Sequence, residues 1–288
     1  MSDPSASPTP RRRASGFQRF ALCFQFEVAK LRRRALPWLG LVAAVVAVGS
    51  VPLFTDSPTN AGEAWTELAE MVRRGLEISS LLIVILGATC VNCERQSSAL
   101  RAYLLRPVSR SEILGAKALT LFSFAGLLVA VVLGLSWTLA SMRFGFEAIT
   151  VEIEGLEPVM KFDGDAMQDM VSRLQLVATL PVFLFAALGL FVSTIIDSEA
   201  TAVTLSILCR MFLGFLAEAF SDQHALGGLR SIATSYERIA ELARGIETQV
   251  QDIEKLTLTH AEIGYPLMML AGLIGASFVV FCKRELNP

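Results

Sequence analysis

The chain has 288 residues, of which 53% are hydrophobic and 18% charged, and its mean hydropathy is +0.54. This composition excludes an ordinary soluble domain and predicts a membrane protein. The formal net charge of −2 is close to zero, so only the distribution of the charges along the chain is informative.

The first 36 residues precede the first long apolar run. Residues 1–16 begin with a stretch rich in Ser and Pro that cannot bury enough apolar surface to fold, so we expect a disordered tail. From Gly16 to Leu36, apolar residues at helical spacing are interleaved with basic ones, which predicts a helix lying in the membrane interface. The alternative is a plain extension of the first span. No apolar core follows the Arg11–Arg13 cluster, so we do not expect a secretory signal.

Six apolar runs are each long enough to cross about 30 Å of hydrocarbon as a helix of about 20 residues. We expect the spans at Pro37–Phe54, Gly75–Val91, Ala118–Met142, Leu174–Ile196, Thr201–Ala219 and Ile263–Cys282. The predicted fold is an all-α membrane protein in which residues 17–288 form one six-span transmembrane domain, with no second soluble domain.

Charge distribution predicts the orientation of these spans, because Lys and Arg favour cytoplasmic flanks. The eight basic residues before Pro37, the basic segment after the second span, and Lys283 with Arg284 all fall on one side. The segments on the other side, at about 55–74, 143–173 and 220–262, carry acidic clusters. We therefore expect both termini in the cytosol. The five cysteines then fall in cytosolic or membrane segments, and no disulfide framework is predicted.

Two extracytoplasmic segments show their own patterns. Apolar residues separated by threes and fours predict an amphipathic helix over Leu229–Thr259, which is too polar to span the bilayer. This helix either packs over the outer mouth of the spans or docks a separate protein. The alternating stretch Thr150–Gly155 is compatible with a small hairpin or with an irregular loop.

A charged segment interrupts the apolar runs between the second and third spans. Ser97–Leu105 has the pattern of a short amphipathic helix, which Pro107 prevents from continuing. The sequence Ser109-Arg110-Ser111-Glu112 has the spacing of a capping box, so a new helix is predicted to begin at Arg110.

This segment resembles one in the permease subunits of type-2 ABC transporters. The residues that carry the resemblance are Glu94-Arg95, Ala99-Leu100-Arg101, Leu104-Leu105-Arg106-Pro107-Val108-Ser109-Arg110 and Glu112-Ile113-Leu114-Gly115-Ala116-Lys117. The order of elements along most of the chain is also similar. The sequence departs from the family pattern by inserting Ala116 into a glycine-lysine pair, and by Ser97-Ser98-Ala99 where a glycine-threonine pair is common.

The resemblance implies partners and roles. Two permease subunits would pair in the lipid bilayer, as a homodimer or a heterodimer, and two separate ABC ATPase subunits would bind their cytosolic faces. The Ser97–Leu105 helix would be the coupling helix, and the coupling residues would be Glu94, Arg95, Leu100, Arg101, Leu104, Leu105, Arg106, Pro107, Ser109 and Arg110. ATP and Mg²⁺ would be bound by the ATPase partner.

Chemistry within the chain itself is sparse. No phosphate-binding loop of the form G-x-x-x-x-G-K-[ST] is present, so we expect no ATP hydrolysis, no catalytic residue and no cofactor in this chain. Cys90 and Cys93 are interpreted as helix-packing residues, with a metal or redox role as the alternative. Arg210 lies in the fifth span, where it either lines a substrate path or pairs with a carboxylate such as Glu218.

We therefore expect the permease subunit of an ATP-driven transporter, an exporter of unidentified substrate in the cytoplasmic (inner) membrane. No metal site and no nucleic-acid partner are predicted. Two rival functions stay open: a non-transporting membrane anchor or scaffold, and a membrane-embedded enzyme.

Overall fold

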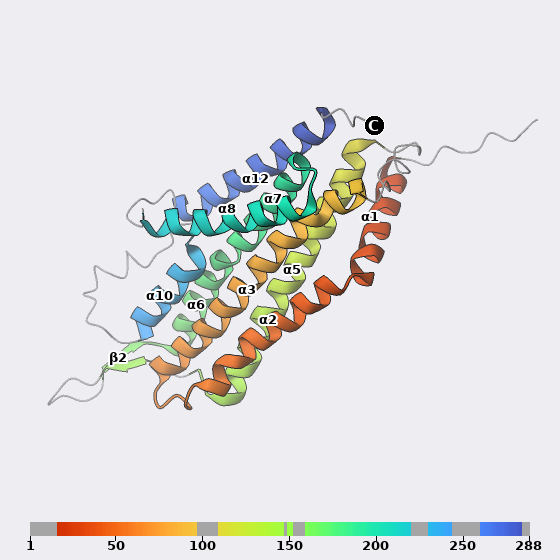
Figure 1. Ribbon diagram of the computed structural model, residues 1–288. Helices are drawn as coiled ribbons and strands as arrows, with labels where there is room; N and C mark the ends of the chain where they lie inside the picture. Colours follow the sequence, from red (N-terminus) through yellow and green to blue (C-terminus); the bar gives the residue numbers. More distant parts are fainter. Residues whose placement is uncertain are drawn as a thin grey trace, which may run out of the picture.

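The computed structural model describes residues 16–96, 109–146, 149–151, 159–219, 230–243 and 260–283. Within them, long helices pack side by side into an elongated bundle (Figure 1). The helices are α1 (Gly16–Arg33), α2 (Ala35–Phe54), α3 (Ala61–Gln96), α5 (Arg110–Arg143), α6 (Gly164–Ala178), α7 (Leu180–Ile195), α8 (Glu199–Ala219), α10 (Ser231–Ala243) and α12 (His260–Lys283). A short antiparallel pair, β1 (Ile149–Val151) and β2 (Val159–Phe162), precedes α6.

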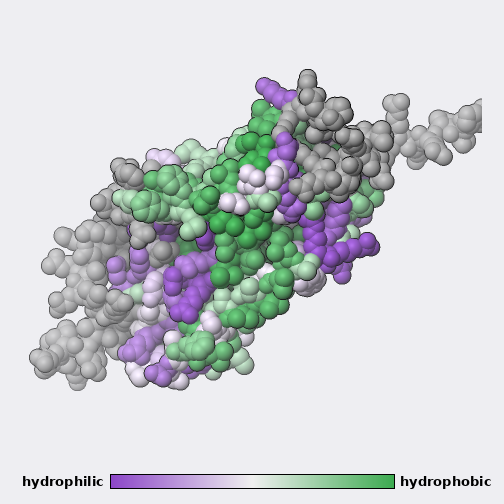
Figure 2. Space-filling view, in the orientation of Figure 1, coloured by the Kyte–Doolittle hydropathy of each residue, from purple (hydrophilic) through white to green (hydrophobic). Residues whose placement is uncertain are grey.

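The six predicted membrane spans are confirmed. Six segments are long and apolar enough to cross a bilayer: α2, α3, α5, α6 with α7, α8 and α12. The chain is therefore a multi-pass membrane protein of the all-α class. Its surface carries a broad hydrophobic belt with hydrophilic groups toward both ends of the bundle (Figure 2).

Two groups of elements define the ends of the bundle. The start of α5 and the end of α12 meet where Arg110 Nη1 donates to the carbonyl of Cys282. We call this the α1 end, because α1 packs there. At the opposite end, α10 and the hairpin lie beside the start of α3 (Figure 1), and we call it the α10 end.

Helix α3 begins at Ala61, well before the predicted Gly75. Hydropathy located only the apolar part of this helix, whereas its first turns are held by ion pairs between charged residues. Nε atoms of Arg73 and Arg74 both lie 2.6 Å from oxygens of Glu70, at the i,i+3 and i,i+4 spacings that stabilise helices. With 36 residues, α3 is about 54 Å long, so it extends beyond the hydrocarbon.

The fourth span is broken in its middle. Pro181 stands in the first turn of α7 and lacks the N–H that would continue the hydrogen-bond ladder of α6. Thr179 therefore bends the chain, and its N–H bonds to the carbonyls of Leu176 and Val177. The helix restarts at Leu180 and runs parallel to α3.

The outer amphipathic helix is confirmed in part. Helix α10 covers Ser231–Ala243, whereas Leu229 and residues 244–259 of the prediction lie outside the described residues. Its Ile232 and Ile239 are buried, and Ser235 Oγ donates to the carbonyl of Leu174 at 2.9 Å. The helix therefore packs along α6 and α3 instead of standing free. The β1–β2 pair matches the hairpin alternative for the alternating stretch, whose residues 152–155 are not described.

Arg143 joins three helices near the α10 end through an ion pair and a hydrogen bond. Arg143 Nη1, in the last turn of α5, donates to Glu67 Oε1 on α3 at 2.8 Å and to the carbonyl of Pro52 on α2 at 2.7 Å. The Glu67 side chain is only 6% exposed, so the Arg143 guanidinium is needed to stabilise the charged form of its carboxylate.

Helices α3 and α7 make the closest backbone contact in the described core. A Cβ on Gly87 would lie 2.9 Å from the carbonyl oxygen of Ala186, and one on Gly189 would collide with the carbonyl of Val84. One turn farther on, Ser193 Oγ accepts from the N–H of Val91 at 3.0 Å. Small residues that let two backbones approach are a common basis of helix association in membranes, where no hydrophobic force holds helices together.

We predict that Gly189→Ala lowers the melting temperature of the purified chain, because the new methyl group has no space between the two backbones. Overpacking of this kind costs about 1–3 kcal/mol. Gly126→Ala on α5 is the matched control, since nothing lies within 4 Å of a Cβ there. Thermal unfolding in detergent measures both variants. Equal melting temperatures for the two would show that the α3–α7 contact is not tight.

Candidate functional site

Most of the predicted coupling residues belong to the segment that joins α3 to α5. Glu94 and Arg95 lie in the last turns of α3, and the segment Ser97–Val108, with the coupling residues from Leu100 to Pro107, is outside the described residues. The predicted coupling helix therefore stays a prediction. The structure does describe the two helices that it joins, and α1 beside them.

Ser109 and Arg110 are described, and they confirm the predicted start of the helix that runs into the third span. Ser109 Oγ accepts from the N–H of Glu112 at 3.1 Å, and Glu112 Oε2 accepts from the N–H of Ser109 at 2.7 Å. This reciprocal pair is a complete capping box, so α5 begins at Arg110 as expected. The end of the predicted coupling segment is thus fixed directly to the first turn of α5.

A buried ion pair connects α1 to α5. Lys117 Nζ lies 3.1 Å from Glu27 Oε2, and the side chains are 1% and 11% exposed. Lys30 approaches the other oxygen of the same carboxylate at 3.3 Å. Removing one member of a buried pair leaves an uncompensated charge, which typically costs about 3–5 kcal/mol. The sequence analysis placed Lys117 within the motif but did not predict its partner, because Glu27 lies 90 residues away.

Further contacts hold α1 against the first turns of α5. Arg19 Nη2 lies 3.8 Å from Glu112 Oε1, so the capping glutamate also contacts α1. Gly115 lies against the ring of Phe20, because a Cβ there would be 3.3 Å from Phe20 Cε2. Any movement of the α5 start therefore also moves α1.

A crevice lies where α1, α3 and α5 meet. Its lining consists of Glu27, Lys30, Leu31, Arg34, Leu86, Cys90, Lys117, Thr120 and Leu121. Cys90 packs against the hydrophobic core, in agreement with a packing role. Among the described residues, no group of three His, Cys, Asp or Glu side chains lies close enough together to hold a metal ion.

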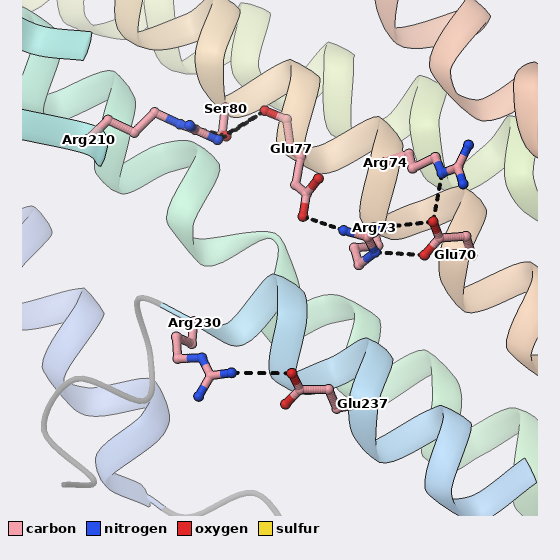
Figure 3. Close-up of polar contacts among 8 residues, drawn as sticks. All are labelled: Glu70, Arg73, Arg74, Glu77, Ser80, Arg210, Arg230 and Glu237. Atoms are coloured by element: carbon pink, nitrogen blue, oxygen red, sulfur yellow. Dashed lines mark hydrogen bonds and ion pairs between the residues drawn. The ribbon is translucent and has the colours of Figure 1, made fainter. Parts of the chain in front are cut away.

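Arg210 reaches from α8 to α3. Its Nη2 donates to Ser80 Oγ at 2.7 Å and to the carbonyl of Glu77 at 3.3 Å (Figure 3). Its guanidinium lies 5.5 Å from the centre of the Phe185 ring. An arginine within a span costs about 3 kcal/mol on insertion scales unless it is paired or hydrated. The contacts to α3 explain how the helix tolerates it. The side chain of Glu218, the carboxylate partner considered from sequence, lies outside the described side chains.

Charged residues continue from this contact along α3 toward the α10 end. We call Glu70, Arg73, Arg74 and Glu77 the α3 charged stripe. Arg73 bridges its two carboxylates, with Nη1 2.8 Å from Glu77 Oε1 and Nε 2.6 Å from Glu70 Oε2 (Figure 3). Arg73 also lies over the ring of Tyr236 on α10, at 5.3 Å. Sequence reasoning missed this stripe, because it assigned most of these residues to a loop.

The stripe is partly exposed on a helix that crosses the membrane. The side chains of Arg74 and Glu77 are 42% and 41% exposed. A hydrophilic patch accordingly interrupts the hydrophobic surface over α3 and α10 (Figure 2). Charged side chains are expensive against lipid tails, so this face is suited to water, polar headgroups or another protein.

Comparison with known protein families finds a match over most of the chain. The family model described as "ABC-2 family transporter protein" matches residues 23–208, well over half of the chain. The matched region runs from α1 into α8 and includes the Glu27–Lys117 pair. No curated protein matches the chain.

We predict that the chain tolerates exchange of the two charges of the α1–α5 ion pair but not replacement of one partner alone. Lys117→Glu alone places two carboxylates together and should destabilise the chain by about 3–5 kcal/mol. The double variant Glu27→Lys/Lys117→Glu restores opposite charges and should recover most of the melting temperature. Lys30→Gln is the control, because it removes the more exposed cation beside Glu27 without adding a negative charge and should cost about 0–1 kcal/mol. A double variant no more stable than Lys117→Glu would contradict a direct pair.

Proposed function

The chain belongs to the ABC-2 transporter family, and from this premise we propose that it is the permease half of an ATP-driven exporter. As a member of this family, it is a transmembrane component of an ABC transporter. The proposal adds that a separate ABC ATPase subunit supplies the energy, that two permease subunits pair, and that the complex lies in the cytoplasmic membrane. ATP and Mg²⁺ would be bound by the ATPase, so this chain would be a non-catalytic subunit.

The α1 end is proposed to face the cytosol. Among the described residues, this end carries the basic side chains of α1 and Arg34 before the first span, and Arg110 at the start of α5. Lys and Arg are retained on cytoplasmic flanks during membrane insertion. The α10 end, with its acidic segments, would then lie outside the cell, and both termini would be cytosolic. Helix α1 exposes the apolar side chains of Phe17, Leu22 and Phe26 and has a basic last turn, which suits a helix lying in the membrane interface.

One observation carries the proposed mechanism: the predicted coupling segment ends on the capped first turn of α5. The first turns of α5 are bound to α1 by ion pairs. An ATPase that pushes on the segment would act on a helix start held by the capping box and by the Lys117–Glu27 pair. A force applied there is passed to α1 and α5 together instead of being absorbed by fraying of the helix end.

Helix α3 would transmit the same force to the opposite end of the bundle. The segment begins where α3 ends, and α3 is joined to α7 by the glycine contact. It is joined to α8 by Arg210 and Ser80, and to α10 by Arg73 and Tyr236. A tilt of α3 would therefore move the α3 charged stripe relative to α8 and α10. Opening of a path between two permease copies is the expected consequence.

We predict that Leu104→Asp/Leu105→Asp abolishes capture of the ATPase. The apolar face of the coupling helix would contact the ATPase, and two buried charges there should reduce affinity at least about tenfold. Pull-down of the tagged full chain from native membranes, followed by identification of nucleotide-binding subunits, measures the effect.

The matched control is Leu53→Asp/Phe54→Asp, which introduces the same two charges at the opposite end of the bundle, where the residues are 80% and 85% exposed. This variant should still capture the ATPase. If the Leu104/Leu105 variant also retains it, the coupling assignment is wrong. If the unmodified chain captures no ATPase, the rival anchor function is favoured.

A further inference from the structure

One side of α3 stays uncovered between α2 and α8, the two helices that flank it in Figure 1. Toward α2, Leu82 lies against Gly40, because a Cβ there would be 3.3 Å from Leu82 Cδ1. Toward α8, Ser80 accepts a hydrogen bond from Arg210. Successive residues of a helix point in different directions, so Leu81 points away from both neighbouring helices, and its side chain is half-buried.

The same side of α3 changes from charged to apolar along its length. Ile78 and Ile85 share the side of Leu81 by helix periodicity, and both are half-buried. Arg74 and Glu77 lie on this side too, toward the α10 end, with side chains 42% and 41% exposed. We call these five residues the open face of α3. Figure 2 shows hydrophobic surface adjoining the hydrophilic patch on this side of the bundle.

This change falls where a bilayer changes as well. The second span is predicted to begin at Gly75, so Arg74 and Glu77 stand at the boundary between headgroups and hydrocarbon. The three apolar residues of the open face follow at the depth of the acyl chains. A phospholipid has the same order, a charged head followed by apolar chains.

Arg74 and Glu77 each use only part of their polar atoms within the chain. Arg74 contacts Glu70 through Nε alone, and Glu77 contacts Arg73 through Oε1 alone (Figure 3). Among the described residues, no hydrogen bond or ion pair engages the two Nη atoms of Arg74 or Oε2 of Glu77. Guanidinium nitrogens bind phosphate well, and a carboxylate oxygen accepts from an ammonium group.

The charge balance of the α3 charged stripe suits a zwitterionic head better than an anionic one. Its two arginines and two glutamates leave no net charge. A phosphate alone at Arg74 would add a negative charge beside Glu70 and Glu77, whereas a phosphate with an ammonium group adds none. The i,i+3 spacing of Arg74 and Glu77 puts their Cβ atoms about 5–6 Å apart, which a short phosphoethanolamine head can span.

A second copy of the chain suits this face less well. Two copies that paired through it about a two-fold axis along the membrane normal would bring the same residues together at the axis. Arg74 would then face Arg74, and Glu77 would face Glu77, so like charges would repel at close range. A zwitterionic head instead offers opposite charges to both side chains.

We propose that the open face of α3 binds a phospholipid with a phosphoethanolamine head. The phosphate accepts from the Nη atoms of Arg74, the ammonium group donates to Glu77 Oε2, and the acyl chains lie along Ile78, Leu81 and Ile85. Both ion pairs of the stripe stay formed in this arrangement. The site goes beyond the proposed transport function, and lipid binding is measured without the ATPase.

The experiment measures thermal unfolding of the purified full chain in detergent, with dioleoyl phosphatidylethanolamine added at increasing concentration. Dioleoyl phosphatidylcholine has the same tails and a quaternary ammonium group that cannot donate, dioleoyl phosphatidylglycerol has no cation, and phosphoethanolamine has no tail. We expect phosphatidylethanolamine to raise the melting temperature at the lowest concentration. The half-saturating concentrations of the other two lipids should be at least about threefold higher, and phosphoethanolamine should have no effect.

This comparison decides the proposal on the unmodified chain, whether or not a variant folds. Equal responses to phosphatidylethanolamine and phosphatidylcholine would overturn it. A response to phosphoethanolamine that matches the response to the lipid would overturn the contact with the acyl chains.

Two variants test the two polar contacts separately. Glu77→Gln removes the charge that attracts the ammonium group, so the preference for phosphatidylethanolamine over phosphatidylcholine should be lost. Arg74→Gln removes the phosphate contact and should raise the half-saturating concentrations of all three lipids at least about threefold, while Glu70 stays bonded to Arg73. A full preference in Glu77→Gln, or unchanged responses in Arg74→Gln, would reject the assigned contacts.

Arg173→Gln is the matched control, because Arg173 also pairs with a carboxylate one turn earlier, Asp169, but lies on α6 outside the open face. It should respond to each lipid like the unmodified chain. Light scattering reports the alternative occupant: a lower dimer fraction in Arg74→Gln with unchanged lipid responses would assign the face to a second copy and overturn the proposal. Arg74→Gln should still capture the ATPase, which distinguishes loss of lipid binding from loss of the transporter assembly.

Discussion

The close contact of α3 with α7 holds the helix from which the main polar contacts of the described bundle extend. Gly87 and Gly189 allow the two backbones to touch, and Ser193 adds a hydrogen bond to the main chain of α3. In a bilayer, helices gain little from burying apolar surface against one another, so close packing and polar contacts determine their positions. With α3 fixed in this way, its polar face is directed toward α8 and α10, and its last turns lead into the predicted coupling segment.

The described bundle is held most firmly along α3 and by charge pairs at each end. At the α10 end, Arg143 joins α2, α3 and α5, and at the α1 end, Lys117 joins α1 to α5. In contrast, α8 and α12 bury only 17% of their apolar windows within the chain. Helices with so much open surface must meet lipid or protein. Few polar contacts attach them: α8 to α3 through Arg210 and Ser80, and α12 to α5 and α10 through Arg110 and Glu262. Such attachment suits helices whose spacing changes while the rest of the bundle moves as a unit.

The spans could be predicted because the bilayer selects for length and hydropathy, both of which are local properties of sequence. The capping box of α5 was also predicted, since its donors and acceptors lie within four residues. The Glu27–Lys117 pair could not be, because its partners are 90 residues apart and only the packing of α1 on α5 brings them together. The first turns of α3 were assigned to a loop, because hydropathy counts Glu70, Arg73 and Arg74 as polar, whereas their mutual ion pairs support a helix.

Arg210 shows why a single residue within a span could be identified from sequence but not interpreted. Sequence marked it as costly and left two roles open, a substrate path or a structural pair. The structure gives it neutral partners on α3 and directs the nearest carboxylate to Arg73 instead. A purely structural arginine would gain most from facing Glu77 itself. Because Arg73 occupies that carboxylate, Arg210 is instead anchored by the Ser80 hydroxyl and the backbone carbonyl of Glu77, and the Glu77 charge acts on it without a direct ion pair.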